Sequence, residues 1–396
     1  MYLELATCTG CVYGILKLYN FQDKRIKDNF RQIVEKAGLY NNKHQSLRVR
    51  EINNLEYGYK LKIGVPYGLG LEDVEKLKDV LLTNTGAKDI EFNRLENKSM
   101  IDIIFTTKSF ENIKYEPKKL RPFEIYVGYT HSNSVIVNLN KFPHVLVGGD
   151  TGTGKSRLLL CILTNLIYNS NIDIHLLQVR KNDLGVFQNC KQVISFSKTL
   201  TDVRDSLEKI DKELQRREIL IDNTKGIYNV EDYNKKDTYK LKYSYVVIEE
   251  FSFLNISKGD SKGEKKTKAE CLRYIKNLVN VGRSSGIFLI TSLQKPTADS
   301  IPTDIKAQLT TRISLTIKDT STSVVVMGDN SATLLKEREF ICKTLNIDKG
   351  HTLTIEHQDV IKNIENSFIE KNAPEVIPIV PNGLNNILSM LNELNN

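Results

Sequence analysis

Eight consecutive residues of this chain match the phosphate-binding pattern G-x-x-x-x-G-K-[ST]. They are Gly149, Asp150, Thr151, Gly152, Thr153, Gly154, Lys155 and Ser156. Glycines let the backbone curl around a polyphosphate, so that its N–H groups and the positive end of the following helix face the anion. In such a loop the lysine reaches the β- and γ-phosphates and the serine hydroxyl binds Mg²⁺. The pattern therefore predicts a site for a nucleoside triphosphate and Mg²⁺.

Two carboxylates follow an apolar run further along the chain. Glu249 and Glu250 come directly after Val246-Val247-Ile248. Carboxylates at the end of a strand beside a triphosphate support the metal shell and polarise the attacking water. We expect Glu249 to support Mg²⁺ and Glu250 to activate water. Two surface glutamates after a buried strand are the alternative interpretation.

A polar residue also follows the next apolar run. Gln294 comes shortly after Ile287–Ser292. A polar side chain at the end of a strand adjacent to the carboxylates can contact the γ-phosphate and report its loss. We expect Gln294 to act as this sensor, and a loop hydrogen bond is the alternative.

These residues require a sheet that brings the ends of several strands together. Apolar runs predict strands at 145–147, 172–179, 245–248, 288–292 and 312–317. Residues 157–163 predict a helix directly after the loop. A second amphipathic helix carries its apolar side chains at helical spacing, at Val203, Leu207, Ile210, Leu214 and Ile221. Strands that alternate with helices predict an α/β fold with a mostly parallel sheet and helices on both faces.

Composition shifts divide the chain into four predicted parts. Residues 121–360 carry the motifs, and residues 45–120 form a small α/β accessory domain. In the accessory domain, period-two alternation predicts a strand at 59–65, helical spacing predicts a helix over 71–81, and residues 101–105 predict another strand. Residues 1–44 form a helical N-terminal segment, for which docking on the protein and contact with a membrane both remain open. Residues 361–396 are a proline-containing linker and an amphipathic helix that docks on its own domain or on a partner.

The composition is that of a soluble protein with a mild basic excess. The 396 residues include 56 basic and 48 acidic side chains, a net charge of +8. This excess permits an anionic partner without establishing one. Six scattered cysteines favour the cytoplasm over a disulfide framework, and the Cys8/Cys11 pair lacks a second pair to complete a metal site. The N-terminal apolar stretch is too short to span a bilayer, so we expect a cytoplasmic protein, with peripheral attachment to the inner face of the membrane left open.

The motifs together resemble those of the FtsK/SpoIIIE family of DNA translocases. The resemblance is carried, in order, by residues 143–156, 246–251, 282–287, 291–296 and 305–313. It implies a RecA-like P-loop NTPase domain, ATP hydrolysis at subunit interfaces, and a hexameric ring that threads DNA. A shorter segment, residues 58–69, resembles the region before the motor in TcpA-like coupling proteins of Gram-positive conjugative elements.

The family resemblance also implies roles for single residues. Lys155 and Ser156 match the nucleotide-binding positions, Glu250 the catalytic carboxylate and Gln294 the sensor. Arg283 and Arg312 fall in arginine-bearing motifs, so either is a candidate for the finger that reaches a neighbour's γ-phosphate. We prefer Arg312, and an ordinary salt bridge is the alternative for each. Glu249 departs from the family, which usually has Asp there.

Lysines that follow the two carboxylates are candidates for contact with DNA. They cluster around Gly259 and Gly263 and are Lys258, Lys262, Lys265, Lys266 and Lys268. A flexible basic loop in a ring's pore contacts phosphates without reading bases. A solvated surface loop is the alternative. Lys306 is a further candidate, by its place in a family motif.

The leading hypothesis is an ATP-driven DNA translocase that acts as the coupling protein of a conjugative plasmid or integrative element. Its partners would be DNA, further copies of the chain in a hexamer, a relaxase and membrane proteins of the transfer complex. Plasmid replication, segregation or DNA packaging are alternatives for the same motor. Protein secretion and a scaffold that binds ATP without hydrolysing it are further alternatives.

Overall fold

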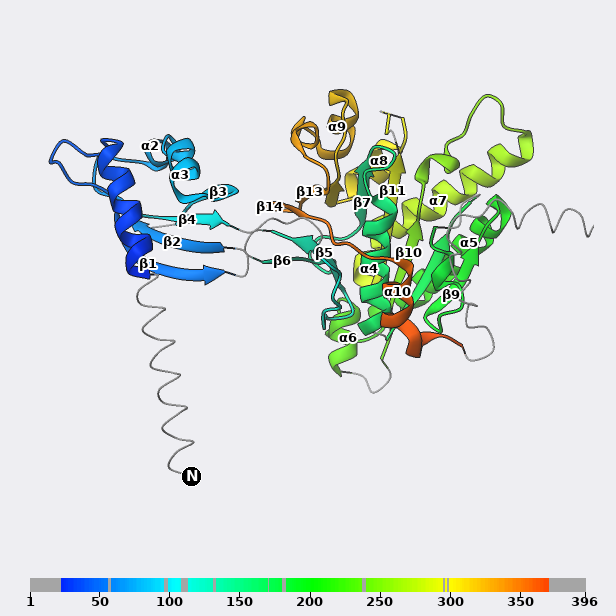
Figure 1. The fold of residues 1–396 in the computed structure, drawn as a ribbon. Coiled ribbons are helices and arrows are strands. Elements are labelled where there is room, and N and C mark those ends of the chain that lie inside the picture. The colour runs from blue at the N-terminus through cyan, green and yellow to red at the C-terminus, as the bar shows by residue number, and fades with distance from the viewer. Residues whose placement is uncertain are drawn as a thin grey trace, which may run out of the picture.

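Two β-sheets, of four and ten strands, organise the part of the chain that the structure describes (Figure 1). The structure is a computed structural model. It describes residues 23–55, 58–95, 99–107, 113–130, 133–169, 171–179, 183–236, 240–294, 296–297 and 299–369. The predicted C-terminal helix, the Cys8/Cys11 pair and the apolar N-terminal stretch lie outside these residues. The predicted domain limits, near residues 44, 120 and 360, stay predictions.

The smaller sheet is antiparallel, with its strands in the order β1-β2-β4-β3. The strands are β1 (Arg48–Leu55), β2 (Gly58–Gly64), β3 (Asp89–Arg94) and β4 (Met100–Thr106). The single helix expected over 71–81 is instead two short ones, α2 (Leu71–Glu75) and α3 (Lys78–Thr85). Val74, Leu77 and Leu81 are nevertheless all buried in one core. Helical spacing therefore identified the buried face but not the turn that breaks the helix.

The larger sheet has a parallel centre with an antiparallel extension. Its order is β6-β5-β14-β13-β12-β7-β11-β10-β8-β9, and the six strands from β12 to β9 run parallel. The parallel strands are β7 (Val145–Gly149), β8 (Ile172–Leu177), β9 (Val193–Ser197), β10 (Tyr243–Ile248), β11 (Ile287–Gln294) and β12 (Thr311–Ser314). The extension consists of β5 (Glu124–Tyr129), β6 (Ser134–Asn138), β13 (Glu339–Lys343) and β14 (Ile347–His351). The predicted mostly parallel α/β fold is confirmed.

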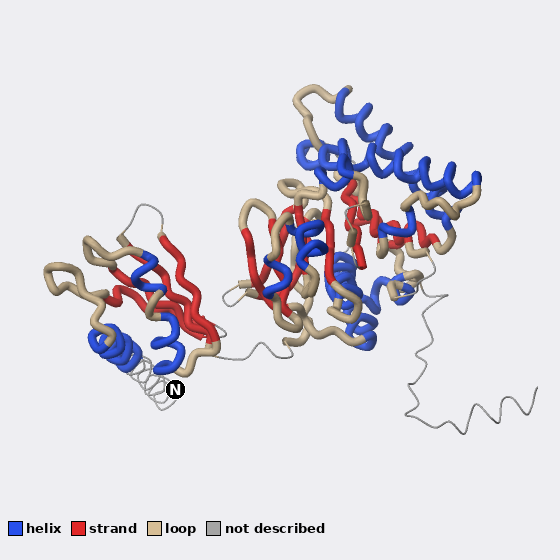
Figure 2. The backbone as a smooth tube through the Cα atoms, turned by 90° about the horizontal axis from the view of Figure 1, so that it is seen from above, coloured by secondary structure: helices blue, strands red, loops and turns tan. Residues whose placement is uncertain are grey.

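Helices cover both faces of the larger sheet (Figure 2). One core contains Val145 and Val147 of β7 together with α4 (Lys155–Asn169), α6 (Val230–Lys236) and α10 (His357–Ile364). The other contains Leu146 of the same strand. Its helices are α5 (Leu200–Asp222), α7 (Lys262–Ser285), α8 (Thr303–Gln308) and α9 (Thr320–Met327). Successive side chains of a strand point to opposite faces, which is why neighbouring residues enter different cores.

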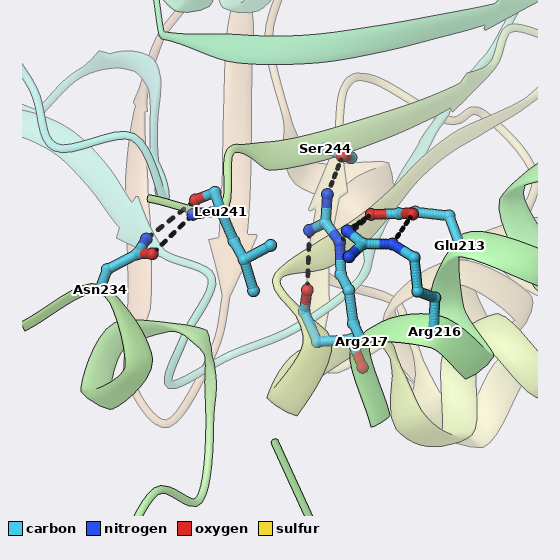
Figure 3. A network of polar contacts seen from close by, with 7 residues as sticks. Glu213, Arg216, Arg217, Asn234, Leu241 and Ser244 are labelled. Atoms are coloured by element: carbon cyan, nitrogen blue, oxygen red, sulfur yellow. Dashed lines mark hydrogen bonds and ion pairs between the residues drawn. The ribbon is translucent and has the colours of Figure 1, made fainter. Parts of the chain in front are cut away.

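A buried arginine fastens α5 to the sheet (Figure 3). The Arg217 guanidinium donates to the carboxylate of Glu213 at 2.7 Å, to the carbonyl oxygen of Ser285 at 2.9 Å and to the hydroxyl of Ser244 at 3.3 Å. A buried charge is tolerated when it has an ionic partner and further hydrogen bonds. Arg217 therefore ties α5 to the start of β10 and the end of α7.

Gly148 sets how closely β7 approaches α9. A Cβ at this position would lie 2.5 Å from Cγ2 of Val326. The Gly148→Ala variant is therefore expected to lose about 1–3 kcal/mol of unfolding free energy, the usual cost of overpacking a core. Urea unfolding measures this loss. Gly259→Ala is the matched control, because Gly259 has open space around its Cβ position. An unchanged unfolding midpoint for Gly148→Ala would contradict the packing described.

No helix in the described ranges combines the length and the apolar character needed to cross a bilayer.

Candidate active site

The phosphate-binding loop lies between the end of β7 at Gly149 and the start of α4 at Lys155. Gly152 and Gly154 have φ angles of 82° and 102°, in the region that L side chains rarely adopt. Glycine is the residue that adopts these angles without strain. The Thr153 hydroxyl donates to the carbonyl oxygen of Asp150 at 2.8 Å, which closes the turn. The local backbone is thus shaped to present its N–H groups to an anion.

The Lys155 side chain is folded into the loop. Lys155 is only 5% exposed. Its Nζ donates to the carbonyl oxygens of Gly149 and of Asp150, the latter at 2.8 Å. A buried ammonium needs such acceptors to offset its lost hydration. The cation lies where the loop would enclose a polyphosphate, so the residues present fit a nucleoside triphosphate.

The Asp150 side chain connects the loop to the segment after β12. Its Oδ2 accepts the backbone N–H of Lys318 at 3.0 Å, and its own N–H donates to the carbonyl oxygen of Thr316 at 3.1 Å. Lys318 directly precedes Asp319, which caps the start of α9. The loop is therefore held from both sides, by α4 and by the β12–α9 connection.

Ser156 contacts a carboxylate that the sequence did not indicate. Its hydroxyl donates to Oδ2 of Asp183 at 2.8 Å. Asp183 follows β8, and its only signal in the sequence was its place a few residues beyond a predicted strand. Hydroxyl and carboxylate oxygens are the ligands that Mg²⁺ prefers, so this pair fits the metal.

Glu250 and Gln294 meet beside the loop. Strand β11 lies between β7 and β10, and Gln294 is the register partner of Gly149. The backbone N–H of Gln294 donates to Oε2 of Glu250 at 3.0 Å, and the Ser252 hydroxyl donates to Oε1 at 2.7 Å. The two residues expected to act on the γ-phosphate are thus neighbours at the carboxyl edge of the parallel sheet.

Glu249 lies inside the protein. It is 3% exposed, and its carboxylate accepts a hydrogen bond from the Gln178 side-chain amide. Its carbonyl oxygen accepts the hydroxyl of Ser292 in β11. Alternation along an extended chain sends Glu249 and Glu250 in opposite directions, which explains the difference in burial. Support of Mg²⁺ by Glu249 stays a prediction, and the hydroxyl of Ser156 is bonded to Asp183.

The two candidate arginine fingers donate hydrogen bonds to carbonyl oxygens of their own chain. Arg283 is near the end of α7, which precedes β11, and its Nε donates to the carbonyl oxygen of Asn140 at 2.8 Å. Arg312 pairs in register with Leu146, and its guanidinium donates to the carbonyl oxygens of Leu309 and Val326, both at 3.4 Å. A finger acts on a neighbouring subunit, so its identity stays a prediction.

The expected flexible basic loop is wrong for residues from 262 onward. Helix α7 begins at Lys262, with Ser261 as its cap and Glu264 completing a capping box. Reciprocal bonds of this kind stabilise a helix start despite the glycine at 263. The helix therefore carries Lys262, Lys265, Lys266 and Lys268.

The candidate DNA-binding lysines differ in their ion pairs, hydrogen bonds and burial. Lys268 forms an ion pair with Asp260 at 2.9 Å and donates to the carbonyl oxygen of Asn255 at 2.8 Å. Lys306 lies on α8, where burial and then the charge of Arg312 lower the pKa of its ammonium. Lys262 and Lys266 are exposed.

Within the described residues no cluster of three His, Cys, Asp or Glu side chains is arranged to hold a metal.

Known proteins resemble this chain in sequence. The profile of the FtsK/SpoIIIE family matches residues 104–332, more than half of the 396 residues. The chain is 25% identical over 316 residues to the DNA translocase FtsK of Lactiplantibacillus plantarum, covering 73% of this chain and 38% of that protein. It is 29% identical over 216 residues to FtsK of Campylobacter jejuni, covering 52% and 22%. The chain thus spans well under half the length of these relatives.

Solved structures share the fold. The pCW3 conjugation coupling protein TcpA, in its monomer form with ATPγS, matches with a TM-score of 0.61 at 20% identity, covering 86% of this chain and 99% of that one. EssC from Geobacillus thermodenitrificans, ATPases 2 and 3, matches with a TM-score of 0.54 at 13% identity, covering 65% and 50%. From the family match over more than half of its length, together with the fold, the chain belongs to the FtsK/SpoIIIE family.

Proposed function

We propose that this chain is an ATP-driven DNA translocase and the coupling protein of a conjugative plasmid or integrative element. The observation that carries the proposal is the convergence of Lys155, Ser156, Glu250 and Gln294 at one edge of the parallel sheet. Each residue type there matches a task in phosphoryl transfer. Membership of the FtsK/SpoIIIE family supports DNA as the substrate, and the shared fold with TcpA supports conjugation as the setting.

The site's residues divide the chemistry between them. Lys155 neutralises charge on the β- and γ-phosphates, and Glu250 takes the proton of the attacking water as general base. Mg²⁺ supplies further charge neutralisation on the phosphate oxygens when it is bound. Gln294 contacts the γ-phosphate as a sensor, since it lies beside Gly149 and touches Glu250 through its backbone. An arginine of the neighbouring subunit stabilises charge on the γ-phosphate. Arg312 is preferred to Arg283 for this role.

DNA would contact the start of α7, and Lys306 on α8 is a separate candidate. Lys262, Lys265 and Lys266 lie together on the first turns of α7. Contacts between lysines and the phosphate backbone are independent of sequence, as a translocase requires. We place the protein in a hexameric ring in the cytoplasm, at the inner face of the membrane, with a relaxase and the membrane proteins of the transfer complex as partners.

One experiment tests the substrate. ATPase activity is measured with single-stranded DNA, duplex DNA or neither, for the wild type and for Lys262→Ala/Lys265→Ala/Lys266→Ala. We expect DNA to stimulate the wild type, and the triple variant to lose most of the stimulation. Binding of the triple variant should also depend less on salt, with a log–log slope smaller by about 2–3, since each lost phosphate contact removes nearly one unit.

A second candidate is protein secretion, because the fold is shared with EssC and with the type VII secretion ATPase EccC of Thermomonospora curvata, whose TM-score is 0.51. Stimulation of the ATPase by a secreted protein, with no response to DNA, would favour this function and contradict translocation of DNA. Duplex unwinding without relaxase binding would instead favour a role of the ATPase in plasmid replication.

A further inference from the structure

The carboxylate nearest to the P-loop serine comes from an unexpected strand. Asp183 lies beyond the carboxyl end of β8, and its Oδ2 accepts the Ser156 hydroxyl at 2.8 Å. We propose that Asp183 is the carboxylate that orients Ser156 toward Mg²⁺, in the position that the family pattern assigns to Glu249. The proposal rests on the nucleotide site described above and deepens it.

The direction of this hydrogen bond suits a metal ligand. A serine hydroxyl has one hydrogen and two lone pairs. Because the hydrogen points to Asp183, the lone pairs of Ser156 are left for a cation. Groups that hydrogen-bond a metal ligand in this way fix its orientation and typically change metal affinity by about 10–100-fold when they are removed.

Oε2 of Glu249 is bonded within the protein. Its carboxylate is bonded by the amide of Gln178, a residue that is itself 1% exposed, and its main chain is bonded to β8 and β11. Glu249 therefore joins three strands from within the sheet. Glu249, which stands where the family usually has Asp, thus links neighbouring strands. In this proposal, the aspartate side chain at the metal site is that of Asp183.

The charge of Asp183 should affect nucleotide affinity in opposite directions with and without Mg²⁺. Without metal, a carboxylate beside a polyphosphate repels it, whereas with Mg²⁺ the same charge attracts the cation. Replacing Asp183 with Asn keeps an oxygen for the Ser156 hydroxyl and removes only the charge. Nucleotide binding should then be unchanged or tighter in EDTA, and weaker in Mg²⁺. A residue that only maintained the fold would weaken binding in both conditions.

The test measures binding rather than turnover. Affinity for a fluorescent ATPγS analogue is determined in EDTA and in saturating Mg²⁺, and free Mn²⁺ is followed by its paramagnetic resonance signal in the nucleotide complex. For Asp183→Asn we expect about tenfold weaker Mn²⁺ binding, at the lower end of the range for such partners. Asp222→Asn, at the exposed end of α5, is the matched control. Glu249→Gln is measured in parallel.

The outcomes separate this proposal from the nucleotide site itself. If the wild type fails to bind ATPγS at all, the proposed ATPase site is wrong. If the wild type binds and Asp183→Asn shows unchanged Mn²⁺ affinity, Asp183 has no role at the metal. A loss for Glu249→Gln as large as that for Asp183→Asn, or a loss for Asp183→Asn in EDTA as well as in Mg²⁺, would also overturn the assignment.

Discussion

Replacement of Glu250 with Gln is expected to reduce ATP turnover by about 10²–10⁴-fold, the usual contribution of a general base. The amide keeps the length of the side chain and one acceptor oxygen, which can keep the bond now donated by the Gln294 backbone, while the rotatable Ser252 hydroxyl can turn to accept from the new NH₂ group. It loses the ability to take a proton from water. ATP should therefore still bind, and the bound nucleotide should persist unhydrolysed.

Phosphate release in a single turnover measures the effect of Glu250→Gln, and equilibrium binding of ATPγS shows that the site is intact. Glu116→Gln is the control, because Glu116 is exposed on the segment that precedes β5. Turnover by Glu250→Gln at the wild-type rate would rule out Glu250 as the general base and direct attention to another carboxylate at the sheet edge.

Replacement of Lys155 with Ala is expected to remove nucleotide affinity. The ammonium is held within the loop by the carbonyl oxygens of Gly149 and Asp150, and alanine leaves neither a charge nor a donor there. Charge-assisted hydrogen bonds contribute about 1.5–3 kcal/mol each, so binding of ATPγS should weaken by about 100-fold or more. Equilibrium titration with a fluorescent ATPγS analogue measures the change.

The matched control for Lys155→Ala is Lys209→Ala, because Lys209 is exposed on α5. Urea unfolding checks that Lys155→Ala remains folded, since Lys155 is buried. The two central variants should differ in kind: Glu250→Gln binds and does not hydrolyse, whereas Lys155→Ala fails to bind. Wild-type affinity in a folded Lys155→Ala protein would contradict the assignment of the loop.

Local features of the sequence predicted the loop and its flanking elements well. Residues 143–163 contain the strand, the glycine turn and the helix in one continuous stretch, so their geometry depends mainly on near neighbours. The start of α7 was equally local, because Ser261 and Glu264 form a capping box, yet the glycines at 259 and 263 favoured a flexible loop. Here the capping pair outweighs the tendency of glycine to break a helix.

Contacts between distant segments were beyond the sequence pattern. The Ser156–Asp183 bond joins residues 27 apart, and no periodicity marks Asp183. The antiparallel strands β5, β6, β13 and β14 were likewise missed, since such short strands show too few residues for a clear alternation. The break between α2 and α3 falls within an unbroken helical spacing, so only the observed backbone reveals it.

Residue types and spacings alone predict a phosphate-binding loop, two carboxylates after one strand and a glutamine after the next. These features depend on residue types at fixed spacings, which a single chain displays directly. The fold fixes where each carboxylate lies. The pleat turns Glu249 into the sheet and Glu250 out of it, and strand order brings Gln294 beside Gly149 and Asp183 to Ser156. Side-chain direction and strand neighbours arise from packing, and packing is settled only when the whole sheet has formed.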